Sequence, residues 1–168
     1  TITVKVTDPE NVAPIRINAG GGNYITADGR FFEADRYFEG VDRTSSVANV
    51  DIRNTTDDEL YRFARSSESF SYNIPVYNGK MKVTLHFAEI YWGVYPGRTA
   101  RPDRRKFSVL AEGLSKISNY SILTKTGGPL IAVKQTFEVT VTDGRLNLDF
   151  IKISDQPSVS AIEVEFLQ

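Results

Sequence analysis

Cysteine and histidine, which supply thiol nucleophiles, redox groups and zinc ligands, are almost absent from this 168-residue sequence. Cysteine is absent, which excludes disulfides and the cysteine-based metal and redox motifs. His86 is the single histidine, so a zinc site built on histidine ligands is not predicted. The acidic run 57–59 and Asp28 offer oxygen ligands, but their spacing matches no calcium loop. The sequence therefore predicts no metal site and no cofactor.

An adjacent pair of aromatic residues, Tyr91 and Trp92, and the acidic residue Asp155 are other side chains with binding chemistry. On pattern alone, two aromatics at the end of a strand are typical of a protein core, to which aromatic residues contribute much of the buried area. Successive residues of a regular strand point to opposite faces, so at most one of these rings is expected to face the core. Asp155 precedes Gln156 and Pro157, a setting that is typical of a residue that caps a turn.

Charge is balanced over the whole chain and concentrated in one loop. The sequence has 20 basic and 21 acidic residues, so it predicts no general attraction to nucleic acid or to a membrane surface. No apolar run approaches the ~20 residues that a membrane span requires. Between Arg98 and Lys106, four arginines and one lysine crowd a proline-containing loop. Such a cluster is typical of a solvated loop, and recognition of an anion is the alternative.

Alternation of apolar and polar residues with a period of two is the dominant pattern, and it predicts β-strands. In the segment 80–91, Val83, Leu85 and Phe87 point to one side of the strand. His86 falls among the polar residues of the opposite side, which predicts a histidine on the sheet surface. Four further runs show similar alternation: 15–18, 69–74, 106–111 and 161–167.

Turn residues separate these runs at short intervals. Asp143 and Gly144 stand between the alternating runs 136–142 and 146–150, which predicts a β-hairpin. The segment 56–65 has the spacing of a capping box, but it lacks a convincing helical stripe of apolar residues. Many short strands separated in this way predict an all-β fold, either a sandwich or a barrel.

Seven short motifs follow one another along the chain. They are Ile-Asn-Ala-Gly-Gly at 17–21, Glu-Ala-Asp-Arg-Tyr-Phe at 33–38, Asp-Asp-Glu-Leu-Tyr at 57–61, Phe-Ser-Tyr-Asn-Ile-Pro at 70–75, Leu-His-Phe-Ala-Glu-Ile-Tyr-Trp at 85–92, the run 139–144, and Asp-Gln-Pro at 155–157 ahead of Ser-Ala-Ile-Glu at 160–163. In order and spacing they resemble the malectin family, which is also classed as a family of carbohydrate-binding modules. The resemblance covers residues 14–168. Residues 1–13 are predicted to be a linker or the last strand of a preceding domain.

The resemblance implies a jelly-roll-like β-sandwich of two antiparallel sheets, with loops at one end that hold a glucose-containing oligosaccharide. Tyr91 and Trp92 match the aromatic pair that contacts sugar in the family, and Asp155 matches its sugar-binding acid. This set suits a pyranose, because the C–H face of the sugar packs on an aromatic ring while its hydroxyls bond to a carboxylate.

The sequence departs from the family at two further sugar-contacting tyrosines. One would lie near Arg65, where Ser66 stands, and the other would lie in the segment 43–45, where no aromatic stands. Half of the aromatic clamp is therefore missing, which leaves the identity of the glycan open. Tyr95 and Tyr37 are nearby aromatics that could substitute. The candidate ligand-binding residues are Tyr91, Trp92, Asp155, Tyr95 and Arg65.

The leading hypothesis is a non-catalytic carbohydrate-binding module. It would tether a larger exported protein, such as a glycosidase or an adhesin, to glucan-type or related glycans outside the cell, at the cell surface or in the periplasm. The absence of cysteine and the start at Thr1 favour a bacterial accessory domain cut from such a parent, whose neighbouring domains would be its protein partners. The alternative is a structural or interaction spacer whose sugar pocket has degenerated.

A glycoside hydrolase is the third and least favoured hypothesis. It would require two carboxylates about 5–10 Å apart across a cleft. Glu89 and Asp155 are the candidates near the implied site. Glu89 is expected to lie on a strand, where a structural hydrogen bond explains it better than acid catalysis.

Overall fold

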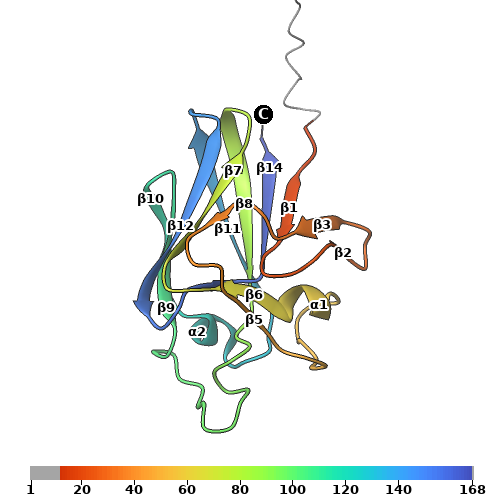
Figure 1. Cartoon of the computed structure of the whole chain (residues 1–168), viewed down its shortest axis with the longest axis vertical. Coiled ribbons are helices and arrows are strands. Elements are labelled where there is room, and N and C mark those ends of the chain that lie inside the picture. Colours follow the sequence, from red (N-terminus) through yellow and green to blue (C-terminus); the bar gives the residue numbers. More distant parts are fainter. Residues whose placement is uncertain (1–11, 168) are drawn as a thin grey trace, which may run out of the picture.

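The computed structural model describes residues 12–167, which form two large β-sheets packed face to face (Figure 1). The first sheet has the strand order β11 (Val133–Val141), β8 (Gly79–Phe87), β14 (Ala161–Phe166), β1 (Ile15–Asn18), β3 (Phe31–Ala34) and β2 (Tyr24–Ile25). The second has the order β10 (Leu114–Tyr120), β9 (Lys106–Ala111), β12 (Arg145–Ser154), β7 (Phe70–Pro75) and β4 (Phe38–Glu39). The predicted all-β sandwich is confirmed.

Two features go beyond the predicted pair of antiparallel sheets. The pairing of β1 with β3 is parallel, and Ile17 lies opposite Glu33 in its register. A third sheet, with the order β13 (Ser158–Val159), β6 (Phe63–Ser66) and β5 (Thr44–Ser46), lies below the other two in the view of Figure 1. This small sheet matters for function because β5 and β6 contribute residues to the candidate site described below.

The main core lies between the two large sheets and follows the predicted alternation. On β8, Val83, Leu85 and Phe87 are fully buried in one apolar cluster. Leu148 and Phe150 of β12 belong to the same cluster and come from the opposite sheet. Apolar burial of this kind is the main favourable contribution to folding. The period-two pattern therefore identified the faces of these strands correctly.

The predicted hairpin at Asp143 and Gly144 is wrong, because the strands on either side of this turn belong to different sheets. β11 pairs with β8 in the first sheet, and β12 pairs with β7 and β9 in the second. The Gly144 N–H donates to the Asn78 side-chain carbonyl over 2.7 Å, and the Gly144 carbonyl accepts from Val76. This turn therefore crosses between sheets beside the β7–β8 connection, which also crosses between them.

Two short helices interrupt the strands: α1 (Asp58–Tyr61) and α2 (Ile122–Thr126). The segment 56–65, in which no helix was expected, contains α1, and its capping-box spacing forms no capping box, since Asp57 is the N-cap residue and makes no side-chain cap. Each helix spans about one turn, which is too short to produce a visible apolar stripe. Within the described residues, no helix is long and apolar enough to cross a membrane.

His86 is buried, which corrects the prediction of a surface histidine. Only 1% of its surface is exposed, because Tyr61 of α1 and Phe32 of β3 pack edge-on against its ring at 5.7 and 6.0 Å between centroids. The period-two pattern gives the face of a strand correctly, but it does not show that a distant helix covers that face. His86 lies on the outer face of the first sheet under this cover.

The segment 18–22 forms a tight turn whose backbone lies close to its neighbours. Gly20 has a φ of +75°, and the Gly21 N–H donates to the Asn18 carbonyl over 3.1 Å. A Cβ added at Gly20 would lie 2.5 Å from backbone atoms of Ala64 on β6. Glycine is required here on both counts.

Candidate functional site

A pocket of about 200 Å³ lies where the loop after β8, the small third sheet and the turn after β12 meet. The loop after β8 is the green segment at the bottom of Figure 1. The residues that line the pocket are Arg43, Ser45, Ser66, Tyr91, Trp92, Arg105, Asp155 and Gln156. Three of the five candidate residues from the sequence, Tyr91, Trp92 and Asp155, thus share one pocket.

Tyr91 and Trp92 lie in a loop rather than on a strand, since β8 ends at Phe87. Their rings meet edge to face, with centroids 5.0 Å apart and an interplanar angle of 84°. Both side chains are half-buried, and neither belongs to the main core cluster. The pair therefore presents two differently oriented aromatic surfaces at one end of the sandwich.

Glu89 fixes the conformation of this loop through hydrogen bonds. Its carboxylate is 1% exposed and accepts hydrogen bonds from the backbone N–H groups of Tyr91 and Trp92, at 3.1 and 3.4 Å. It also accepts from Nε of Arg105 over 2.9 Å. A buried carboxylate is stable only when it is paired and hydrogen-bonded. Glu89 lies beyond the end of β8, so the strand position expected for it is wrong, while the expected structural hydrogen bonding is present.

Arg105 joins this loop to the turn that carries Asp155. Its guanidinium is 7% exposed and bonds to Glu89 on one side. On the other side it donates to the backbone carbonyl of Gln156 and lies 3.8 Å from Oδ2 of Asp155. The indole N–H of Trp92 donates to the same Oδ2 over 2.8 Å. Arg105 was not singled out in the sequence, where it is one of four arginines in a run of nine residues and carries no distinguishing local signal.

The opposite wall of the pocket is polar and cationic. Arg43 and Ser45 come from the edge strand β5 and the residue before it, and Ser66 comes from β6. These are the segments where the resemblance places the two missing tyrosines. Short hydroxyl side chains and one exposed guanidinium stand there instead of aromatic rings.

The basic loop between Arg98 and Lys106 is only partly solvated. Arg98 lies 5.7 Å from the ring centroid of Tyr91, and Arg104 lies 4.8 Å from that of Trp92. Guanidinium groups at these distances are attracted to the faces of aromatic rings. Together with buried Arg105, the loop therefore supports the aromatic pair.

The two other candidates, Arg65 and Tyr95, do not line the pocket. Arg65 is 2% exposed, pairs with Asp35 at 2.6 Å and lies 3.5 Å from the ring centroid of Phe38. Asp35 therefore holds a buried arginine. Tyr95 is 43% exposed, with its ring centroid 5.7 Å from that of Tyr91, so it stands beside the aromatic pair.

Tyr37, the other aromatic considered as a substitute, is also outside this pocket. It borders a different hollow with Pro14 and Ile15, and Arg36 lies 4.2 Å from its ring centroid. Among the aromatics considered, only Tyr91 and Trp92 line the pocket.

This β-sandwich, with a loop-built aromatic and polar pocket at one end, has a fold of the carbohydrate-binding type. Residues 14–164 match the family model of the malectin domain, and the chain belongs to the malectin family. Over 123 residues it is 31% identical to a probable leucine-rich repeat receptor-like serine/threonine-protein kinase of Arabidopsis thaliana. The match covers 71% of this chain and 12% of the kinase. Because this relative is a plant protein, the bacterial origin expected from the sequence is not shown.

Solved structures give the same fold. The plant receptor-like kinase FER is 26% identical, with a TM-score of 0.74 over 92% of this chain and 42% of FER. The ANXUR1 extracellular domain of Arabidopsis thaliana is 15% identical, with a TM-score of 0.76 over 89% of this chain and 47% of that domain. A β-glucuronidase of Bacteroides uniformis is 15% identical, with a TM-score of 0.76 over 93% of this chain and 18% of the enzyme. The last two likenesses show the fold alone.

Proposed function

We propose that this domain binds a glycan in the pocket formed by Tyr91, Trp92 and Asp155, and that it thereby tethers a larger exported protein to that glycan. The observation that carries the proposal is the 2.8 Å hydrogen bond between the Trp92 indole and Asp155. This bond brings an aromatic surface and a carboxylate to one pocket wall from segments distant in sequence. These are the two groups that a pyranose needs.

The aromatic pair supplies apolar surface for the C–H face of a sugar ring. Asp155 has 34% of its side chain exposed, and its Oδ1 takes part in no hydrogen bond among the described residues. That oxygen is free to accept from a sugar hydroxyl. Ser45 and Ser66 offer hydroxyls, and Arg43 offers N–H donors, from the opposite wall. The pocket therefore has partners for both the apolar and the polar parts of a sugar.

The size of the pocket supports binding of one sugar residue of a longer chain. Its volume of about 200 Å³ is below the range of roughly 300–1,000 Å³ that is typical of sites for drug-sized ligands. We therefore expect modest affinity for glucose-containing oligosaccharides or related glycans, with further contacts to neighbouring sugars outside the pocket.

A glycan array followed by calorimetry on the best oligosaccharide tests this proposal. Tyr91→Ala and Trp92→Ala are expected to abolish detectable binding. Tyr77→Ala is the control, because Tyr77 is an exposed aromatic that does not line this pocket. Unchanged affinity in both pocket variants would refute the site.

A protein-interaction role is the second candidate, and the polar wall of Arg43, Ser45 and Ser66 favours it. One solved structure of this fold contains FER in a complex with the plant peptide RALF23 and LLG2. On this alternative, no glycan on the array would bind, and Arg43→Ala would weaken capture of a protein partner of the parent chain.

A hydrolytic role has little support from the geometry. Glu89 is buried and its carboxylate already accepts from Arg105 and two backbone N–H groups, so it is poorly placed to donate a proton to a glycosidic oxygen. Pure protein is therefore expected to release no reducing sugar. Release that is lost in Glu89→Gln would contradict this expectation.

A further inference from the structure

A second pocket, of about 380 Å³, lies beside α1 on the outer face of the first sheet, and we call it the α1 pocket. Its lining residues are Ala27, Asp28, Arg30, Asn54, Thr55, Thr56, Asp57, Leu60, Tyr61, His86 and Lys134. They come from the turn between β2 and β3, the loop before α1, α1 itself, β8 and β11. The α1 pocket shares no lining residue with the pocket at Tyr91 and Trp92.

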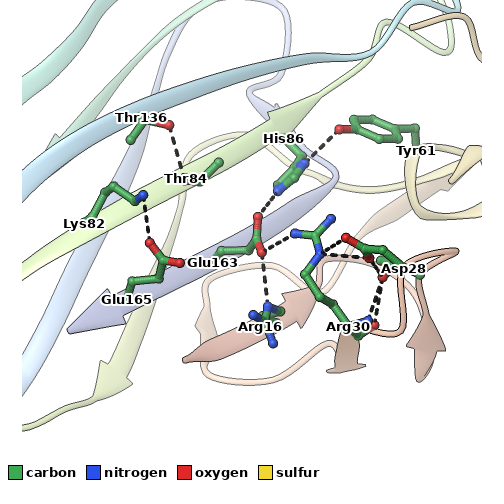
Figure 2. Close-up of polar contacts among 11 residues, drawn as sticks. Arg16, Asp28, Arg30, Tyr61, Lys82, Thr84, His86, Thr136, Glu163 and Glu165 are labelled. Atoms are coloured by element: carbon green, nitrogen blue, oxygen red, sulfur yellow. Dashed lines mark hydrogen bonds and ion pairs between the residues drawn. The ribbon is translucent and has the colours of Figure 1, made fainter. Parts of the chain in front are cut away.

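The floor of the α1 pocket is a preformed chain of hydrogen bonds (Figure 2). The Tyr61 hydroxyl lies 2.8 Å from Nδ1 of His86, and Nε2 of His86 lies 2.7 Å from Glu163. Arg30 and Arg16 also bond to Glu163, at 2.8 and 3.2 Å. An ionised carboxylate only accepts, so Nε2–H of His86 donates to Glu163. These bonds hold the floor in one geometry.

Asp57 supplies an acceptor that the fold leaves open. It is 8% exposed, and its Oδ1 accepts from the Ala27 N–H over 2.7 Å and from the Tyr24 hydroxyl over 3.1 Å. Its Oδ2 makes no hydrogen bond, and Asp57 forms no ion pair, among the described residues. Because Asp57 lines the pocket, this oxygen can accept a hydrogen bond from a molecule bound there. Asp57 thus gives the α1 pocket a carboxylate acceptor for a ligand that donates hydrogen bonds.

Two basic side chains that can donate hydrogen bonds, Lys134 and Arg30, also line the α1 pocket. Lys134 of β11 is paired in register with His86, is exposed, and forms no ion pair among the described residues. Arg30 is 31% exposed and is held by Asp28 and Glu163. The lining thus contains two acidic residues, Asp28 and Asp57, and two basic residues, Arg30 and Lys134. These charges balance, so the lining favours neither an anion nor a cation.

We infer that the α1 pocket is a second binding site and that it takes a neutral polyhydroxylated ring, such as a hexose or a terminal hexosyl residue. Each hydroxyl of such a ring donates and accepts at once, which matches carboxylates and ammonium or guanidinium groups placed around one cavity. This site is independent of the proposed function, because it uses none of the residues around Tyr91 and Trp92. The domain would then hold two sugar residues at separate places.

Amide chemical-shift titration by NMR tests the inference. Glucose, galactose and mannose are added separately to the wild-type protein and to Trp92→Ala. With at least one sugar, the amides of Ala27, Thr56 and Lys134 are expected to shift and saturate, with the same midpoint in both proteins. No shift at these amides with any of the three sugars would overturn the inference, as would shifts that vanish in Trp92→Ala.

Variants inside the α1 pocket give the second part of the test. Asp57→Asn keeps the shape of the side chain and is expected to weaken binding by at least about tenfold, because a bond to a charged acceptor is lost. Lys134→Met, on an exposed strand position, tests the site even if Asp57→Asn fails to fold, and it too is expected to weaken binding. Lys125→Met is the control, since Lys125 is also exposed but lies on α2, away from the pocket.

Further results of the NMR titration also test whether the α1 pocket binds a neutral sugar. Saturable shifts with inorganic phosphate but not with the sugars would overturn the neutral-ring assignment. A titration in which Ala27 and Lys134 respond while the Trp92 indole does not would support the α1 pocket and count against the proposed function. The reverse result would support the proposed function and overturn the second site.

Discussion

The indole N–H of Trp92 donates to Oδ2 of Asp155 over 2.8 Å, although the two residues are 63 positions apart in the chain. Arg105 approaches the same carboxylate to 3.8 Å and is itself held by buried Glu89. The two loops that carry the candidate site are therefore joined by one continuous polar network. Affinity for a ligand should depend on this network as well as on the groups that touch the ligand.

Loss of the Asp155 carboxylate should affect both binding and stability. Asp155 has a φ of +56°, a conformation that aspartate and asparagine tolerate better than alanine. Asp155→Ala is expected to abolish glycan binding and to lower the free energy of unfolding by about 1–2 kcal/mol, because the Trp92 N–H also loses its acceptor. Asp155→Asn should retain most of the stability and lose most of the binding. Urea denaturation and calorimetry on both variants measure these effects, and equal stability of the two would contradict the account.

Removal of one member of the buried ion pair should destabilise the whole site. Glu89→Gln leaves the buried Arg105 guanidinium with only the Asp155 carboxylate, 3.8 Å away, as a counter-charge, so we expect a loss of about 3 kcal/mol in the free energy of unfolding. Glu138→Gln is the matched control, because Glu138 pairs with Lys80 on the surface and exposed ion pairs contribute little. Thermal and urea unfolding monitored by circular dichroism compare the two. Similar losses in both variants would show that the burial of Glu89 has no special effect.

Low pH should destabilise the fold because Glu163 becomes protonated. Burial opposes its ionisation, but the hydrogen bond from His86 and the charges of His86 and Arg30 lower the pKa of Glu163 from 4.5 to about 2. A lowered pKa stabilises the fold above the unfolded value, and this contribution disappears as the pH falls from about 4.5 to about 2. The difference corresponds to about 3 kcal/mol. Unfolding free energies measured across this range should decline in the wild type and vary less in Glu163→Gln.

Gly20 should be intolerant of any side chain. Gly20→Ala combines a positive φ with a Cβ only 2.5 Å from backbone atoms of Ala64. Gly97 has a similar φ of +73° but open space around it, so Gly97→Ala should lose only about 1–2 kcal/mol. We expect Gly20→Ala to lose at least about 1 kcal/mol more, as measured by urea denaturation. Equal losses in the two variants would mean that the backbone near Ala64 moves to accommodate the added Cβ with no loss of stability.

The sequence predicted which faces of the strands are buried, because a local period-two pattern records that property. Val83, Leu85 and Phe87 lie in the core as expected, and the order of the motifs identified the family. The hairpin at Asp143 and Gly144 was wrong, since a tight turn signals a change of direction and not the sheet that the next strand joins.

The candidate site was predicted in part, and the limits are physical. Tyr91, Trp92 and Asp155 were chosen from the resemblance, and the structure places them in one pocket, whereas their contact with a sugar stays a prediction. Arg65 was a candidate because it lies next to a position where the family has a sugar-contacting tyrosine. In the structure it is buried and forms an ion pair with Asp35. The role of Arg105 depends on Glu89, 16 residues away, and on the turn at Gln156, so no local pattern could show it.

The position of β14 has a consequence for how the chain is assembled. This strand follows all other described strands in chain order, yet it lies inside the first sheet between β8 and β1. Until β14 has been synthesised, β8 and β1 lack the strand that pairs with both of them in the finished sheet. Contacts so remote in sequence favour slow folding and a late cooperative step. A chain that stops before residue 161 should therefore remain open to aggregation through the strand edges with which β14 would pair.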